Sequence, residues 1–181
     1  MKIKETPLKD CYILEPTIFE DERGYFCEKY NEKTFEENTG LNGHFVQDNI
    51  SKSGYGVLRG IHLQKGEYAQ AKLVSCLEGN VWDVAVDLRK TSPTFGQWFG
   101  VELSSENKLQ FYVPRGFGHG FSVLSETALF AYKCDNFYNK ESEGGVLYSD
   151  EGLNIDWKLP ENDIILSEKD KIQLSFSAEN F

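Results

Sequence analysis

Three histidines are the side chains of this sequence best suited to moving protons at neutral pH, because the unperturbed pKa of an imidazole is about 6.5. His62 closes the run Gly56-Val-Leu-Arg-Gly-Ile-His62, and His119 closes the run Pro114-Arg-Gly-Phe-Gly-His119. His44 has no such pattern around it, and we expect it at the surface. A lone histidine on a strand is more often structural than catalytic. A chemical role therefore depends on other polar side chains that converge with His62 and His119.

The spacing of these two runs resembles the two sequence motifs of the cupin barrels. In the first cupin motif a glycine is followed after five residues by a histidine, as Gly56 is followed by His62. The second motif contains Pro-x-Gly-x-x-His, which residues 114–119 match. Because the two runs are well separated in the sequence, the resemblance is to a whole double-stranded β-helix, the all-β jelly-roll barrel of the cupins.

Two positions depart from the metal-binding form of the first motif. Gln64 stands where a metal cupin has its second histidine, and Lys72 stands where it has a glutamate, six residues before Gly79. A metal ion needs several imidazole and carboxylate ligands, whereas an ammonium group has no lone pair and repels a divalent cation. We therefore expect no metal here, and instead a proton abstraction beside a cation. Taken alone, Lys72 would be a solvated strand residue.

Strand periodicity gives these residues candidate neighbours, because alternate side chains of a strand point to the same face. Gln47 and Asn49 share one face, which is either the polar lining of a pocket or an ordinary solvent-facing side. Arg59 and His62 have opposite parity, so a regular strand would direct them to opposite faces. A bulge at Gly60 would bring both side chains inward.

The middle of the chain is rich in strand-like runs that could build such a barrel. Val, Phe and Tyr are frequent in these runs, and turn formers such as those in SKSGYG, TSPTFG and LSSEN separate them. The turn LEGN at 77–80 indicates a tight hairpin between two strands. Short strands at short intervals favour an antiparallel sandwich or barrel. The predicted strands cover residues 25–30, 45–50, 57–63, 72–77, 81–88, 97–103, 110–113, 120–124 and 127–134.

Two short helices are expected to flank the strands. Asn31 is a good N-cap for EKTFEENT, and Gly40 is a good residue to end that helix. Ser167 could cap a second helix, SEKDKIQLS, in which Asp170 takes the third position. Residues 149–160 look irregular, and we expect Trp157 there to pack against the barrel.

Composition limits the class of protein. The 181 residues are enough for one domain, 1–181, and 19 Lys and Arg against 29 Asp and Glu give a net charge of −10. Such a surface repels polyanions, so we expect no nucleic-acid partner. No apolar run could cross a bilayer, and the N-terminal residues lack the apolar stretch of a signal peptide. Four scattered cysteines fit a reduced, soluble, cytoplasmic protein without a membrane partner, although they could form two disulfides in a secreted chain.

Nearly the whole chain, from about Leu8 to Asp170, resembles the dTDP-4-dehydrorhamnose 3,5-epimerases, which are metal-free cupins of deoxysugar nucleotide synthesis. The similarity rests on several long blocks in the family's order, which is far more specific than any single short pattern. The blocks are FEDERGYFCE at 19–28, VLRGIHLQ at 57–64, VAVDLRKTSPTFGQW at 84–98, VPRGFGHGF at 113–121 and YKCDNFYNKESEGG at 132–145.

The resemblance implies a homodimer of jelly-roll barrels that uses no cofactor and no metal, with the N-terminal segment of about 1–30 reaching the partner's site. It implies that His62 is the general base, Tyr132 the acid on the opposite face of the sugar, and Lys72 the cation beside the developing enolate. Asp170 would orient His62, although a helix-capping carboxylate is the other interpretation of that residue. Contacts with the nucleotide and the sugar would come from Phe19, Arg23, Glu28, Gln47, Asp48, Asn49, Arg59, His119, Tyr138, Glu143 and Lys169.

The implied reaction suits these residue types. Its substrate, dTDP-4-dehydro-6-deoxy-D-glucose, is a 4-keto sugar whose C3 and C5 hydrogens are acidic because loss of either gives an enolate. Inversion at both carbons gives dTDP-4-dehydro-L-rhamnose, on the route to dTDP-L-rhamnose and cell-envelope polysaccharide. An imidazole can remove the proton, an ammonium group can stabilise the enolate, and a phenol can return a proton from the other side.

Three other functions stay open at this point. An epimerase that inverts only C3 or only C5 would use the same base, cation and acid. A metal-dependent cupin is disfavoured by Gln64 and Lys72. A non-catalytic module that binds a sugar nucleotide would not need His62, Lys72 and Tyr132 together.

Overall fold

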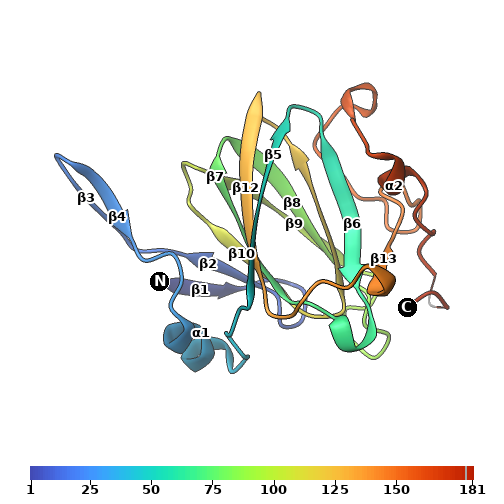
Figure 1. Ribbon diagram of the computed structural model, residues 1–181, viewed down its shortest axis with the longest axis horizontal. Coiled ribbons are helices and arrows are strands. Elements are labelled where there is room, and N and C mark those ends of the chain that lie inside the picture. Colours follow the sequence, from blue (N-terminus) through green and yellow to red (C-terminus); the bar gives the residue numbers. More distant parts are fainter. Residues whose placement is uncertain (178) are drawn as a thin grey trace.

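Two antiparallel sheets face each other and form the body of the protein, for which the computed structural model describes residues 1–177 and 179–181 (Figure 1). Neighbouring strands in each sheet come from distant parts of the chain, as in a jelly-roll barrel. The first sheet has the order β1 (Lys2–Glu5), β2 (Tyr12–Glu15), β10 (Gln110–Val113), β7 (Lys72–Glu78), β12 (Thr127–Cys134) and β5 (Gln47–Gly54). The second has the order β13 (Glu143–Gly145), β6 (Leu58–Gln64), β11 (Phe117–Val123), β8 (Asn80–Asp87) and β9 (Trp98–Ser104).

Apolar side chains from both sheets fill the space between them. Phe111 and Phe130 from the first sheet meet Leu103 and Phe121 from the second in one buried cluster. Burying each such side chain contributes roughly 1.5–3 kcal/mol to folding. Phe121 and Phe130 stack with their ring centroids 4.1 Å apart, and both also line a polar cavity. The apolar core therefore ends at this aromatic pair, and the adjoining part of the barrel interior is left to polar side chains.

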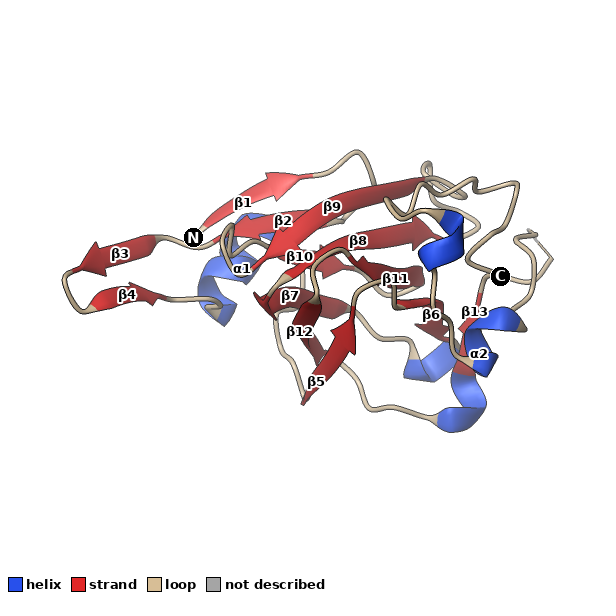
Figure 2. Cartoon of the chain, turned by 90° about the horizontal axis from the view of Figure 1, so that it is seen from above, coloured by secondary structure: helices blue, strands red, loops and turns tan. Residues whose placement is uncertain are grey.

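A hairpin of two strands, β3 (Ile18–Asp21) and β4 (Gly24–Cys27), extends away from the barrel (Figures 1 and 2). It forms a sheet of its own and pairs with neither of the larger sheets in the described part of the chain. Phe19 and Phe26 on this hairpin are 61% and 67% exposed. A single copy of the chain therefore leaves these aromatic side chains in water.

The helix α1 (Glu32–Thr39) covers the outer face of the first sheet. The Asn31 side chain accepts a hydrogen bond from the Thr34 N–H at 3.0 Å, and Gly40 takes the left-handed conformation that ends the helix. Phe35 is fully buried and packs against Tyr112 in a third apolar cluster. The helix and both of its predicted ends are confirmed.

The C-terminal segment is fixed to the second sheet by backbone hydrogen bonds at two places. The Ile165 N–H donates to the Gly56 carbonyl at 2.8 Å, and the Leu147 N–H donates to the Leu174 carbonyl at 2.9 Å. Trp157, 5% exposed, packs into the apolar cluster beneath this segment, as predicted. The short helices are η1 (Gly66–Tyr68), η2 (Lys140–Ser142), η3 (Glu161–Asp163) and α2 (Glu168–Lys171), of which α2 lies between the two fixed points.

The all-β jelly-roll fold with short flanking helices is confirmed, but the predicted hairpin at 77–80 is wrong. β7 is paired with β10 along one edge and with β12 along the other, so no edge is free for β8. β8 therefore lies in the other sheet, and the turn carries the chain from one sheet to the next.

Four strands were not predicted, namely β1, β2, β3 and β13. Each is only three or four residues long, which is too short for a strand period to show against charged neighbours. The second predicted helix is shorter than expected, because α2 has only four residues. Within residues 1–177 and 179–181, no helix is long and apolar enough to cross a membrane.

Candidate active site

A cavity of about 290 Å³ opens between the two sheets, next to the stacked pair of phenylalanines. Its walls come from both sheets and from the C-terminal segment: Ser51, Arg59, His62, Lys72, His119, Phe121, Phe130, Tyr132, Ser167, Lys169 and Asp170. A second pocket of about 140 Å³ shares His62, Lys72, Tyr132 and Lys169 with it. This second pocket adds Gln47, Asn49, Gln64, Gln70, Cys134, Tyr138 and Glu143 to the polar lining. Because they share walls, the two pockets together form one candidate site.

A bulge in β6 directs two of the predicted residues into this cavity. His62 pairs with His119 on β11, but Arg59 pairs with Phe121, so three steps on β6 match two steps on β11. Because of this extra residue in β6, the side chains of Arg59 and His62 point to the same face of the strand, and both line the cavity. Gly60 lies at the bulge with φ of +135°, and a Cβ there would lie 2.5 Å from the Gly120 Cα. The predicted bulge is confirmed, and only glycine fits at its centre.

His62 and Asp170 form a close pair between β6 and α2. His62 Nε2 lies 2.6 Å from Asp170 Oδ1, and the Asp170 side chain is only 3% exposed. Asp170 also accepts hydrogen bonds from Ser167 Oγ at 2.5 Å and from the Gly60 N–H at 3.3 Å. Burial acts to raise the pKa of Asp170, but the contacts with His62 and Ser167 outweigh it and lower this pKa to about 2. Asp170 is therefore a fixed carboxylate across the neutral range.

Lys72 and Tyr132 face His62 from the other sheet. Lys72 on β7 lies beside Cys134 on β12, and Tyr132 lies two residues along β12, so the two side chains share the inner face. Burial lowers the pKa of Lys72, whereas Cys134 and Asp83 act to raise it. Burial also raises the pKa of Tyr132, which keeps its phenol protonated at neutral pH. An amine whose pKa is lowered by burial and a protonated phenol are thus placed across the cavity from an imidazole.

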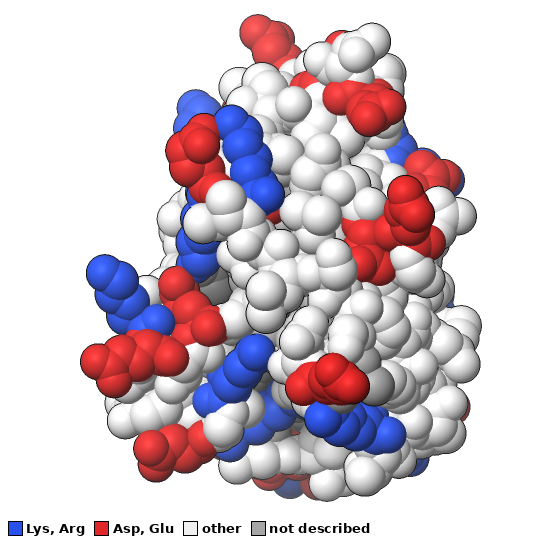
Figure 3. All heavy atoms as spheres, turned by 90° about the vertical axis from the view of Figure 1, so that its right-hand side faces the viewer, with Lys and Arg blue, Asp and Glu red and all other residues white. Residues whose placement is uncertain are grey.

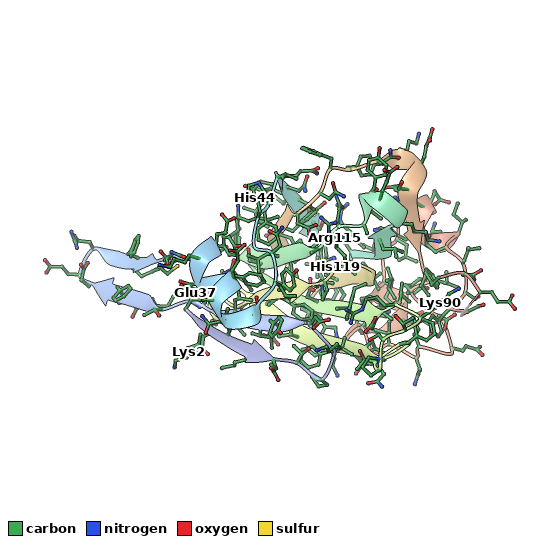
Figure 4. All side chains as sticks on the ribbon, turned by 90° about the horizontal axis from the view of Figure 1, so that it is seen from below. Lys2, Glu37, His44, Lys90, Arg115 and His119 are labelled. Carbon is green, nitrogen blue, oxygen red and sulfur yellow. The ribbon has the colours of Figure 1, made fainter. Side chains whose placement is uncertain are left out.

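His119 lies deeper in the cavity wall, with a carboxylate behind it. Its Nε2 contacts both carboxylate oxygens of Asp83, at 2.9 and 3.0 Å, and both residues are buried. Burial lowers the pKa of His119 and raises that of Asp83, while their mutual attraction opposes both effects. Figure 4 shows His119 within the body of the barrel. His44, in contrast, is exposed near Glu32, as predicted.

Further charged and polar residues that the sequence predicts as ligand contacts lie at the opening of the site. Lys169 Nζ lies 2.6 Å from Glu143 Oε2, and Tyr138 beside them is about half exposed. Arg59 is held by Ser53 Oγ, which lies 3.2 Å from both Nε and Nη2.

Gln47 and Asn49 from β5 line the second pocket and contact each other. Gln47 Nε2 donates to Asn49 Oδ1 at 3.0 Å, so the two amides form one polar edge. The pocket-lining interpretation of this strand face is therefore correct. Asp48 between them points the other way, with its side chain 72% exposed and paired with Lys133 at 2.8 Å. The strand alternation that brings its two neighbours inward takes the Asp48 side chain out of the site.

Three predicted site residues belong to the N-terminal hairpin region and do not line this cavity. Phe19 and Arg23 lie on the projecting hairpin, where the Arg23 guanidinium pairs with Asp21 at 2.5 Å. Glu28 follows the hairpin and accepts a hydrogen bond from Asn31 Nδ2 at 3.2 Å. These side chains cannot join the site of their own chain in this arrangement.

Two residues of the site were not given a role there by the sequence. Asp83 is a carboxylate within the apolar run VWDVAV, and this local contrast is a signal that could have identified it. Ser167 was predicted only as a helix cap, and it does accept a hydrogen bond from the Asp170 N–H. Its hydroxyl also donates to the carboxylate of Asp170, which no local pattern indicates.

Gln64 has a role that the cupin motif does not suggest. Its Oε1 accepts a hydrogen bond from the Asn139 N–H at 3.1 Å, which ties β6 to the loop that carries Tyr138. Among residues 1–177 and 179–181, no three His, Cys, Asp or Glu side chains are grouped as a metal ion would need.

The positive charges suited to an anionic ligand gather around the cavity rather than in a patch on the outer surface. On the face drawn in Figure 3, acidic and basic side chains are interspersed and neither kind forms a continuous patch. Arg59, Lys72 and Lys169 instead converge on the cavity, in a chain whose net charge is −10. A local cationic site can therefore bind an anion even though the protein as a whole is acidic, because distant charges are screened over about 8 Å in physiological salt.

Comparison with known proteins points to a single family. Residues 5–178 match the profile of the family described as dTDP-4-dehydrorhamnose 3,5-epimerase. The dTDP-4-dehydrorhamnose 3,5-epimerase of Salmonella typhimurium is 56% identical over 173 residues, which cover 94% of this chain and 92% of that protein.

Two solved structures are similar to this chain over nearly all of its length. The crystal structure of dTDP-4-dehydrorhamnose 3,5-epimerase from Elizabethkingia anophelis superposes with a TM-score of 0.97 at 76% identity, covering 100% of this chain and 99% of that one. The dTDP-6-deoxy-D-glucose-3,5-epimerase of Legionella pneumophila, solved in complex with dTDP-4-keto-L-rhamnose, gives a TM-score of 0.93 at 51% identity, covering 99% and 96%.

Proposed function

The chain belongs to the dTDP-4-dehydrorhamnose 3,5-epimerase family, and we propose that its cavity performs the reaction of that family through His62, Tyr132 and Lys72. The protein is an epimerase that inverts C3 and C5 of dTDP-4-dehydro-6-deoxy-D-glucose and gives dTDP-4-dehydro-L-rhamnose in dTDP-L-rhamnose biosynthesis. One observation carries the residue assignment: His62 projects from one sheet, and Tyr132 and Lys72 project from the other, into the same cavity.

His62 acts as the general base that removes a proton from carbon. The Asp170 carboxylate, 2.6 Å from Nε2, favours the charged imidazolium that forms when the base takes up this proton. Because the pKa of Asp170 is lowered to about 2, the carboxylate keeps its charge and does not compete for the proton. General-base catalysis of this kind contributes about 10²–10⁴-fold to a rate.

Lys72 acts on the charge that develops when the proton leaves. Loss of the C3 or C5 hydrogen moves negative charge to the C4 oxygen, and an ammonium group beside that oxygen stabilises the enolate more than the ketone. A fixed donor of this type lowers the barrier by about 3 kcal/mol. Lys72 lines the cavity, which supports this role because its side chain then meets the bound ligand.

Tyr132 returns the proton on the face opposite His62. Inversion at a carbon requires that the new proton arrive from the other side of the ring, so a second acid has to face the base. Tyr132 comes from the facing sheet, and burial raises the pKa of its phenol, so the proton is available at neutral pH.

The remaining residues of the cavity bind the substrate. We assign the diphosphate to Arg59 and His119, and the sugar and its neighbouring groups to Gln47, Asn49, Tyr138, Glu143 and Lys169, all of which line the two connected pockets. A guanidinium group has the planar fork that suits phosphate oxygens. Asp48 contributes only through its backbone, because its side chain faces outward.

The N-terminal hairpin serves the site of a second copy in a homodimer. Phe19 and Arg23 extend away from their own barrel, and the exposed aromatic side chains of the hairpin require a surface to cover them (Figure 2). In the partner's site, Phe19 can stack on the thymine base and Arg23 can contact the diphosphate, with Glu28 nearby. The homodimer therefore explains why three site residues lie outside the cavity of their own chain.

The protein acts in the cytoplasm. The substrate is a nucleotide sugar, and we expect the reaction to take place in the same compartment as the synthesis of nucleotide sugars. In the described part of the chain all four cysteines are free thiols, which fits a reducing compartment.

An incubation with dTDP-4-dehydro-6-deoxyglucose in deuterated water, followed by NMR, tests the proposed mechanism. Deuterium at both C3 and C5 of the inverted product is the expected result. Label at one carbon alone would indicate a single-site epimerase, and binding without label would indicate a binding module. Elemental analysis that finds a stoichiometric metal essential for turnover would favour the metal-dependent cupin.

A further inference from the structure

Ser167 lies on the wall of the cavity, and the mechanism above gives it no role. It belongs to the C-terminal segment, directly before α2, and it lines the cavity together with His62 and Asp170. Its hydroxyl donates a hydrogen bond to Asp170 Oδ2 at 2.5 Å. Hydrogen bonds from a hydroxyl to a charged carboxylate are short and are stronger than those between neutral groups. Ser167 therefore contacts the residue that contacts the base.

The two oxygens of the Asp170 carboxylate have separate partners. Oδ1 lies 2.6 Å from His62 Nε2 and accepts a hydrogen bond from the Gly60 N–H at 3.3 Å. Oδ2 has the Ser167 hydroxyl as its hydrogen-bond donor within residues 1–177 and 179–181. The torsion that turns an aspartate carboxylate has a broad energy minimum, so contacts at one oxygen leave the group free to tilt. The contact at Oδ2 fixes the plane of the carboxylate.

Helix capping does not account for the proton of this hydroxyl. A capping side chain only has to accept a hydrogen bond from the backbone, and Ser167 Oγ accepts one from the Asp170 N–H at 3.3 Å. The same Oγ also donates its proton to the carboxylate. An aspartate would cap a helix equally well, but when ionised it has no proton to donate and would add a second negative charge. A hydroxyl meets both requirements.

The helix α2 is too short to orient Asp170 by itself. It has four residues, and an isolated helical turn is not stable in water. Ser167 is placed instead by the backbone of Ile165, two residues before it. The Ile165 N–H donates to the Gly56 carbonyl at 2.8 Å, and the Ile165 carbonyl accepts from the Leu58 N–H at 3.0 Å. Leu58 begins β6, the strand that carries the base, so the base and Ser167 are held by the same strand.

We propose that Ser167 is a positioning residue of the epimerisation: its hydroxyl holds the Asp170 carboxylate in the plane in which Oδ1 faces His62. The contacts run from the C-terminal segment through Asp170 to the base. The proposal rests on the proposed function, because the orientation of Asp170 affects turnover only if His62 removes the proton. Small misplacements of a catalytic group slow a reaction strongly, so a residue that fixes the partner of the base affects the rate.

The variant Ser167→Gly in the full-length protein removes the hydroxyl and keeps most of the cap. Glycine is itself tolerated at the start of a helix, so the midpoint of thermal unfolding should stay within about 2 °C of the wild type. In steady-state kinetics kcat should fall about tenfold, and KM should stay within about twofold, because the hydroxyl acts on Asp170 and not on the substrate. Ser167→Thr keeps a hydroxyl and should retain kcat within about threefold. A raised KM with an unchanged kcat would make Ser167 a ligand contact and would overturn the proposal.

A double-mutant cycle separates positioning from a merely structural role. Ser167→Gly is combined with Asp170→Ala, which removes the carboxylate. If Ser167 acts through Asp170, its replacement should have no further effect on kcat in this background. A residue that only caps the helix would lower turnover by the same factor in both backgrounds, and that result would contradict the proposal.

Glu168→Gln is the matched control in the same helix. Glu168 follows Ser167 directly, pairs with Lys171 Nζ at 2.6 Å and has a side chain that is 90% exposed. This variant weakens a different side-chain contact of α2 and leaves the Asp170 carboxylate with its partners. Its kcat should be that of the wild type. Equal losses in Glu168→Gln and in Ser167→Gly would assign the effect to the helix as a whole and remove the role of the hydroxyl.

The remaining outcomes also decide the proposal. A kcat for Ser167→Gly within twofold of the wild type would refute it. If Ser167→Gly does not fold, Ser167→Ala replaces it, and an equal kcat in Ser167→Ala and Ser167→Thr would refute it as well. The proposed function fails in a different way, since near-normal turnover in His62→Ala would remove the base itself. An inactive His62→Ala together with a fully active Ser167→Gly would leave the function standing and exclude Ser167 alone.

Discussion

Asp170 Oδ1 lies 2.6 Å from Nε2 of His62, so a residue of the C-terminal segment completes a site whose other walls are strands. Ser167 and the Gly60 N–H hold the same carboxylate, and Gly60 also forms the bulge that directs His62 inward. One glycine therefore connects the orientation of the base to that of its partner. Asp170 lies in the first turn of α2, but the cap of this helix is the Ser167 side chain, and the Asp170 carboxylate contacts His62, the Ser167 hydroxyl and the Gly60 N–H instead.

Replacing Asp170 by Asn should remove a pH-dependent part of the stability. Burial acts to raise the pKa of Asp170, but His62 and Ser167 lower it from 3.8 to about 2. A depressed folded-state pKa gives stability that is complete above the unfolded pKa and is lost as the pH falls through the folded one. The wild type should therefore lose about 2 kcal/mol more than Asp170→Asn between about pH 5 and pH 2. Urea unfolding at several pH values measures this difference, and parallel curves would contradict it.

Replacing Lys72 by Met should lower kcat by about 10²–10³-fold, because the enolate loses its neighbouring cation. The fold should persist, since Lys72 makes no salt bridge within residues 1–177 and 179–181. Lys133→Met is the matched control: Lys133 lies on β12 but on the outer face, paired with Asp48. Steady-state kinetics should show near-normal turnover for Lys133→Met, and a similar loss in both variants would argue against a specific role for Lys72.

Replacing Tyr132 by Phe should impair inversion more than it impairs proton exchange. His62 can still remove and return a proton on its own face, whereas the acid from the facing sheet is lost. In deuterated water, NMR should show label entering the substrate without a matching yield of epimer. An equal loss of exchange and inversion would exclude Tyr132 as the late proton donor.

Gly60→Ala should destabilise the protein and abolish turnover. The φ of +135° is disfavoured for alanine, and the added Cβ would lie 2.5 Å from the Gly120 Cα. Overpacking against backbone costs about 1–3 kcal/mol, and the left-handed strain adds to it. Gly54→Ala is the control, because its nearest atom would be the Glu126 carbonyl oxygen at 3.8 Å. Thermal unfolding of the two variants should differ clearly, and equal midpoints would contradict the requirement for glycine at the bulge.

Mixing two inactive variants tests whether the hairpin serves the partner's site. His62→Ala lacks the base and Arg23→Ala lacks the proposed diphosphate contact. If Arg23 acts across the dimer, each mixed dimer has one site in which both residues are intact. Random exchange should then restore about a quarter of wild-type activity, because half of the dimers are mixed and half of their sites are whole. No recovery after exchange, with mixed dimers confirmed by mass spectrometry, would place Arg23 in its own chain's site.

Features that depend on near neighbours in the sequence could be predicted from it. The ends of α1 at Asn31 and Gly40 follow from side-chain capping and from a left-handed glycine, both of which are local. The bulge at Gly60 follows from the opposite parity of Arg59 and His62 together with the expectation that both face the cavity, because alternation is fixed by the strand itself. The catalytic assignments rested on motif spacing and on family resemblance, and the structure gathers His62, Lys72, Tyr132 and Asp170 around one cavity.

The tertiary structure alone decided which partners those residues meet. The sequence placed β7 and β8 in one hairpin, but the free edges of β7 were taken by β10 and β12, which lie far away along the chain. Pairing of His119 with Asp83 and of Lys72 with Cys134 depends on this strand order. Helix capping and the alternation of side chains along a strand depend on only a few neighbouring residues, so both can be predicted from the local sequence. Strand order is set by competition among distant segments for the same edges and the same core, so it is determined only when the whole chain has folded.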